Sequence, residues 1–116
     1  MITFRNNDQT TRGERIINAI IGRMIERCSY AGMDFEIRDT GMQSGNFRPG
    51  WKYSLSAIVN GDVNLYVNIN ERDIPRFNAA PTPQGRKKGY KFNIQGDIKN
   101  HQDMVSAIDA LFNAMD

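Results

Sequence analysis

The chain has one cysteine and one histidine in 116 residues, and this scarcity removes several classes of site. A single cysteine excludes an intramolecular disulfide framework and any zinc site built on paired thiolates. A single histidine removes most catalytic dyads and histidine metal clusters. We therefore expect no metal and no cofactor, and a reducing, cytoplasmic setting.

Long apolar runs are also missing. No stretch approaches the roughly 18 consecutive apolar residues that read as a membrane-spanning helix, and the first eleven residues are polar, unlike a signal peptide. The sequence predicts no membrane partner and no export signal.

Net charge is small, at +2, while 40% of the residues are hydrophobic and 24% are charged. These values are typical of a globular protein and exclude collagen-like and wholly disordered chains. The length predicts a single domain over residues 1–116, with residues 1–10 as a flexible arm, and argues against a multi-step enzyme.

The charges are segregated along the chain. Residues 86–99 hold five basic residues against one acid, whereas residues 100–116 hold three aspartates and no lysine or arginine. A local basic run of this kind suits an anionic partner, although the total charge is far below that of a dedicated nucleic-acid binder. The predicted phosphate contacts in this run are Arg86, Lys87, Lys88 and Lys91.

Two amphipathic helices are predicted, one near each end of the chain. Residues 11–30 and 100–115 both carry apolar side chains at helical spacing, and Asn100 is a suitable N-cap for the second helix. Three arginines lie along one edge of the first apolar stripe, either as a solvated flank or as a rib that faces a partner: Arg12, Arg23 and Arg27.

A β-hairpin is predicted on either side of Asn60-Gly61, because apolar and polar residues alternate in both flanking segments. A two-residue turn there would place the two apolar rows on opposite faces. We therefore predict a three-residue loop, Val59 to Gly61, that sets Ala57 opposite Val63.

The polar face of this hairpin is the main indication of a binding surface. Asparagine is disfavoured in strands, yet three of them alternate in the second strand with a tyrosine between. The predicted contact residues are Lys52, Asn64, Tyr66, Asn68 and Asn70, with an ordinary solvated face as the alternative.

The remaining segments complete an α+β fold. Residues 34–39 predict an edge strand, 41–50 a loop, 71–88 a long mobile loop with three prolines, and 89–94 a last strand. The predicted architecture is a two-layer sandwich of a four-stranded, mainly antiparallel sheet with the N- and C-terminal helices on one face, in the order α-β-β-β-β-α.

Catalytic residues are not evident. Cys28 lies within the apolar stripe of the first helix, His101 lies beside a helix cap, and the triplet 97–99 (Asp-Ile-Lys) matches only a short fragment of metal-dependent nucleases. The sequence therefore favours a non-enzymatic module, with a metal-dependent nuclease as the alternative.

Two binding functions remain open from the sequence. The first is a nucleic-acid-associated protein that uses the Asn/Tyr sheet face and the basic loop. The alternative is a protein–protein interaction module, such as a phage- or mobile-element-type inhibitor or adaptor of a host protein, with a homodimer also open.

Overall fold

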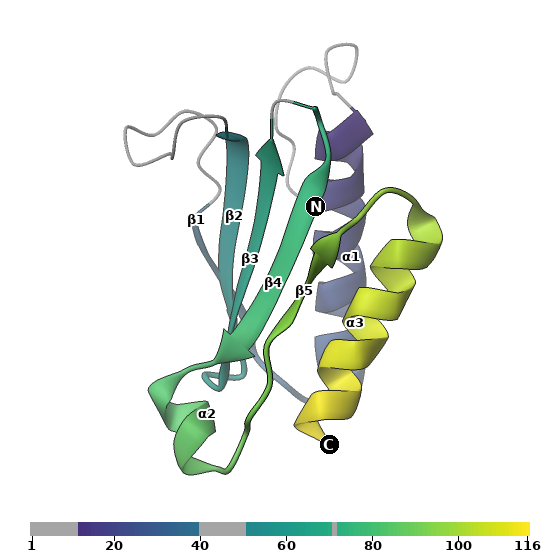
Figure 1. Ribbon diagram of the computed structural model, residues 1–116. Helices are drawn as coiled ribbons and strands as arrows, with labels where there is room; N and C mark the ends of the chain where they lie inside the picture. The colour runs from purple at the N-terminus through teal and green to yellow at the C-terminus, as the bar shows by residue number, and fades with distance from the viewer. Residues whose placement is uncertain (1–11, 40–50, 71) are drawn as a thin grey trace.

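The computed structural model describes residues 12–39, 51–70 and 72–116. Five strands and three helices are assigned there (Figure 1). In chain order they are α1 (Arg12–Ala31), β1 (Phe35–Asp39), β2 (Trp51–Val59), β3 (Val63–Asn70), β4 (Pro75–Pro81), α2 (Pro83–Lys87), β5 (Ile94–Asp97) and α3 (His101–Met115).

The strands form one antiparallel sheet in the order β1-β2-β3-β4-β5, so each strand pairs with the next one along the chain. Helices α1 and α3 lie together on one side of this sheet (Figure 1). The predicted α+β fold, with helices from both ends of the chain on one face, is confirmed. The sheet has five strands, however, and not the four predicted.

The additional strand, β4, lies in the segment that was predicted as a long loop. It pairs with β3 along its full length, from Val63 opposite Pro81 to Ile69 opposite Pro75. The two prolines occupy the first and last positions of the strand, where a missing N–H does not interrupt the ladder. Between them, Phe77 is fully buried. The prolines were wrongly interpreted as loop signals, and residues 71–88 hold β4 and α2.

The last strand is shifted along the chain from its predicted position. β5 begins at Ile94, and Gly96 lies inside it opposite Phe77. Tyr90 and Phe92, predicted to point inward from a strand, do pack against the core, but from an irregular segment before β5. The Tyr90 hydroxyl donates to the carbonyl of Met115 at 3.1 Å, which ties this segment to the end of α3.

The hairpin between β2 and β3 has a different register from the predicted one. Val59 is paired with Val63, so the pairing differs by two residues and each side chain keeps its predicted face. Asn60 and Gly61 have φ values of 53° and 71°, as the central residues of a type I′ turn require, and the Asp62 N–H donates to the Val59 carbonyl at 2.9 Å. Asp62 is therefore the extra residue that restores the alignment of the apolar rows.

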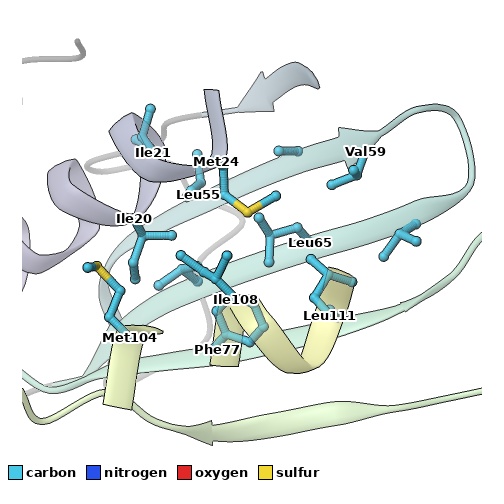
Figure 2. Packing of buried hydrophobic residues seen from close by; sticks show 14 of the residues in the cluster. Ile20, Ile21, Met24, Leu55, Val59, Leu65, Phe77, Met104, Ile108 and Leu111 are labelled. Carbon is cyan, nitrogen blue, oxygen red and sulfur yellow. The ribbon is translucent and has the colours of Figure 1, made fainter. Parts of the chain in front are cut away.

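The core lies between the helices and the inner sheet face (Figure 2). The predicted apolar stripe of α1 supplies fully buried residues, although its member Ile25 is 45% exposed. The predicted cap of α3 is confirmed, because the Asn100 side chain accepts from the Asp103 N–H at 2.8 Å. Two predicted segments lie outside the described residues, namely the arm at 1–10 and the loop at 41–50. Labelled core residues in Figure 2 include Ile20, Met24, Leu55, Leu65, Phe77, Ile108 and Leu111.

One of the aligned arginines of α1 joins the two long helices. The Arg27 Nη1 atom donates to the Asp109 carboxylate at 2.6 Å, and the guanidinium carbon lies 4.4 Å from the ring centroid of Phe112. A charge-assisted hydrogen bond and a cation–π contact thus hold α1 against α3. Arg27 therefore makes its contacts within the fold, and it does not belong to a row of arginines that faces a partner.

Candidate interaction surface

The sheet face opposite the helices is covered by no described helix. Polar side chains from neighbouring strands form two rows across it, because paired residues in antiparallel strands point to the same side. One row runs Ser56, Tyr66, Asn78, Gln95, and the other runs Ser54, Asn68, Arg76, Asp97. We call the open face the surface formed by Ser54, Ser56, Asn64, Tyr66, Asn68, Arg76, Asn78, Gln95 and Asp97.

Three of the predicted contact residues lie at the centre of this surface. The Tyr66 side chain is 42% exposed, and Asn64 and Asn68 on either side are partly exposed. In the described part of the chain, neither of these amides nor that of Asn78 makes a hydrogen bond. Their donors and acceptors are therefore available to another molecule.

Two predicted contact residues are placed only by their backbone. Lys52 lies in β2 and Asn70 at the end of β3, where it pairs with Trp51. The structure does not describe the side chains of Lys52 and Asn70. The sequence also missed Asn78 and Arg76, because both belong to the strand that was interpreted as a loop.

The charges described on the outward side of the sheet are paired with one another. Arg76 contacts the Asp97 carboxylate at 3.2 Å and the Gln95 side-chain oxygen at 3.1 Å, while Arg38 lies 3.4 Å from Glu36. Exposed pairs of this kind contribute little stability. Because the opposite charges in these pairs cancel, the outward side of the sheet is close to neutral.

The predicted basic run lies on and after α2, and part of it serves internal contacts. Lys88 forms an ion pair with Asp62 at 2.9 Å, and Arg86 donates to the Pro81 carbonyl at 3.0 Å. Lys87 and Lys91 are exposed and make no hydrogen bond or ion pair with the residues described. Only two of the four cations predicted in this run are therefore fully available to an anionic partner.

Asp62 is the acceptor that holds α2 against the β2–β3 turn. Its carboxylate is 1% exposed and accepts from Lys88 at 2.9 Å and from the Gln84 amide at 2.9 Å. Burial acts to raise the pKa of Asp62, but the bonds from Lys88 and Gln84, the Lys88 charge and a contact from Asn60 outweigh it. The pKa of Asp62 is consequently lowered from its ordinary value.

Replacing Asp62 by asparagine is expected to lower the free energy of unfolding at neutral pH by about 1–2 kcal/mol, because a charged acceptor of two hydrogen bonds becomes neutral. The pKa of Asp62 is lower in the folded state than in the unfolded state, where it is near 3.9. Asp62 therefore stabilises the fold at pH values above the unfolded pKa, and this contribution is lost as the pH falls through the folded pKa. Urea denaturation at neutral and acidic pH would measure both effects.

Asp97→Asn is the matched control for this substitution, since its ion pair with Arg76 is exposed and its loss is expected to cost less than about 1 kcal/mol. Equal effects of the two substitutions would contradict a special role for Asp62.

A second group of cations lies where α1 and α3 both begin. A cavity of about 440 Å³ there is lined by Arg12, Arg72, Lys99 and the carboxylate-bearing Asp73, among others. Arg12 also donates to the Lys99 carbonyl at 2.5 Å. The sequence did not indicate this cavity, because its lining residues come from segments far apart in the chain.

The residues considered for catalysis lie in three different environments. Cys28 is buried, and burial raises the pKa of its thiol to about 11 although the Arg27 charge acts in the opposite direction. His101 is the exposed first residue of α3, and Asp97 is held by Arg76. Within residues 12–39, 51–70 and 72–116, no three His, Cys, Asp or Glu side chains form a group that could hold a metal ion.

No protein-family model, curated protein or solved structure matches this chain. None of the helices in the described ranges is long and apolar enough to cross a membrane. The function is therefore inferred from the geometry of the chain's own residues.

Proposed function

We propose that this chain is a non-enzymatic binding module that contacts a partner protein through the open face. The observation that carries the proposal is a sheet surface, uncovered by any described helix, whose amides at Asn64, Asn68 and Asn78 have no hydrogen-bond partner among the described residues. Tyr66 lies among them and supplies an exposed aromatic ring, a residue type enriched in protein interfaces.

The charge distribution favours a protein over a nucleic acid as the partner. Phosphate contacts supply much of the affinity of nucleic-acid binders, and these contacts need free cations. Arg76 and Arg38 on the outward side are paired with carboxylates, and Lys88 and Arg86 are engaged beside α2. A neutral surface rich in amides suits hydrogen bonding to another protein, such as a host protein that an inhibitor or adaptor would engage.

A nucleic acid is the second candidate, and specific cations support it. Lys87 and Lys91 are exposed and uncommitted, and Arg12, Arg72 and Lys99 line the cavity at the helix starts. On this hypothesis, these side chains hold phosphates while Tyr66 stacks on a base.

Asn68→Lys separates the two candidates, because one added cation acts in opposite directions on them. For a protein partner that contacts the open face, we expect binding to weaken about tenfold, since a bulky charge replaces a hydrogen-bonding amide. For a nucleic acid, the affinity increases and depends more steeply on salt. Affinity capture with quantitative mass spectrometry identifies the protein partner, and fluorescence anisotropy measures its dissociation constant and that of oligonucleotides.

Ala110→Lys is the matched control, because Ala110 is exposed on α3 on the other side of the molecule. It adds the same charge away from the open face and is expected to leave protein binding unchanged. The protein proposal is wrong if Asn68→Lys and Ala110→Lys retain the captured partner equally, or if the unmodified chain binds oligonucleotides with strong salt dependence and no protein.

A further inference from the structure

The outer edge of β1 pairs with no strand in the described part of the sheet. β1 is the first strand in the sheet order, and its other side is paired with β2 from Phe35 opposite Val59 to Asp39 opposite Ser56, with a register shift between Ile37 and Asp39. Figure 1 shows β1 at one margin of the sheet, with the two long helices toward the opposite margin. An edge of this kind presents backbone groups that can pair with another strand.

Apolar side chains along this edge are incompletely covered. Phe35 and Ile37 face the core side of the sheet, yet both remain partly exposed. Their neighbours in β2 on the same face, Val59 and Ala57, are buried at 0% and 1% exposure. The cover over the core side of the sheet is therefore incomplete at β1, and apolar surface continues to the edge.

Glu36 and Arg38 give β1 a charge pattern that is complementary to a second, antiparallel copy of the same strand. Glu36 and Arg38 point to the same side, because their side chains lie 3.4 Å apart, and they are 62% and 56% exposed. When two copies pair antiparallel about a two-fold axis and keep their faces aligned, the axis passes through one residue. An axis at Glu36 sets two carboxylates opposite each other, and an axis at Arg38 sets two guanidinium groups opposite each other.

An axis at Ile37 is the arrangement that avoids like charges. It places Glu36 of each copy opposite Arg38 of the other, so that symmetry makes two complementary pairs. It also sets the two Ile37 side chains beside each other on the apolar face. The opposite margin of the sheet offers no such arrangement, since β5 has only Gln95 and Asp97 on its outward side.

We propose that β1 is a self-association surface, and that its partner is the β1 strand of a second copy of this chain, paired antiparallel about Ile37. The dimer extends the described five-stranded sheet across the two-fold axis and buries Phe35 and Ile37 further. This proposal goes beyond the proposed function, because it uses a different surface from the open face.

Sedimentation velocity over a wide range of protein concentration tests the proposal. We expect a reversible monomer–dimer equilibrium, and we expect Glu36→Arg to raise the dimer dissociation constant about tenfold, because it places arginines opposite each other twice. The decisive variant is the double exchange Glu36→Arg with Arg38→Glu. It restores both complementary pairs and is expected to restore the dimer.

Ala110→Arg on α3 is the matched control, because it adds the same charge away from β1 and from the open face, and it is expected to leave the dimer unchanged. Far-UV circular dichroism and thermal melting report on the fold of each variant. The proposal is overturned if the chain stays monomeric throughout, in which case the charges of β1 protect an unused edge, or if the double exchange fails to restore a dimer that the single exchange weakened. A dimer unaffected by Glu36→Arg also overturns it. Partner capture by the open face is measured separately, so either proposal can fail alone.

Discussion

Replacing Phe77 by alanine is expected to lower the free energy of unfolding by about 3–5 kcal/mol, which is the usual cost of truncating a fully buried phenylalanine. Phe77 is 0% exposed and lies in the core cluster with Ile108 and Leu111 of α3 (Figure 2). Truncation removes apolar contacts and leaves a cavity between sheet and helices. The midpoint of urea denaturation, followed by circular dichroism, would measure the loss.

Tyr66→Ala is the matched control for this substitution. Tyr66 also lies within the sheet, but its ring is 42% exposed on the open face, so its removal is expected to cost less than about 1 kcal/mol. A small effect of Phe77→Ala would contradict the placement of β4 in the core and would return residues 71–88 to a surface loop.

Replacing Gly85 by alanine is expected to cost about 3 kcal/mol, at the upper end of the usual penalty for overpacking. Gly85 is buried where α2 meets the β2–β3 turn, and a Cβ there would overlap the Asp62 backbone oxygen and lie 3.3 Å from the Pro81 Cβ. The Asp62 backbone oxygen cannot give way easily, because it also accepts from the Thr82 N–H at 2.8 Å. Thermal and urea denaturation would measure the destabilisation.

Hydrogen exchange would show whether the effect of Gly85→Ala is centred on α2. The Gly85 N–H donates to the capping Thr82 side chain at 3.1 Å, and this amide and its neighbours are expected to lose protection. Gly96→Ala is the control, since a Cβ there meets nothing within 4 Å. A variant at Gly85 as stable as the one at Gly96 would show that α2 does not pack tightly against the turn.

The sequence predicted which side of the sheet three of the candidate contact residues face, but it did not predict all the residues beside them. Asn64, Tyr66 and Asn68 lie on the outward side of β3, as the alternation predicted, even though the pairing register was wrong by two residues. The face was preserved because an even shift keeps each side chain on its side of the sheet. Asn78 was missed because Pro75 and Pro81 mark loops in most sequences.

Charge pairing could not be predicted, because it depends on contacts between distant residues. The sequence places Lys88 in a basic run and Asp62 just after the predicted turn, 26 positions earlier, with nothing to connect them. The ion pair forms only because β4 returns the chain beside the turn and α2 follows it. Lys88, predicted as a phosphate contact, is engaged in this ion pair, and its engagement supports the proposal of a protein partner.

The sequence by itself determined the two amphipathic helices, the hairpin and the outward face of β3, because the spacing of apolar residues sets which side of each element is buried. The tertiary structure alone decided the strand between Pro75 and Pro81 and the engagement of Lys88 by Asp62. The physical reason is that backbone pairing and the desolvation of a carboxylate depend on which segments meet in space, and local spacing along the chain does not specify those meetings.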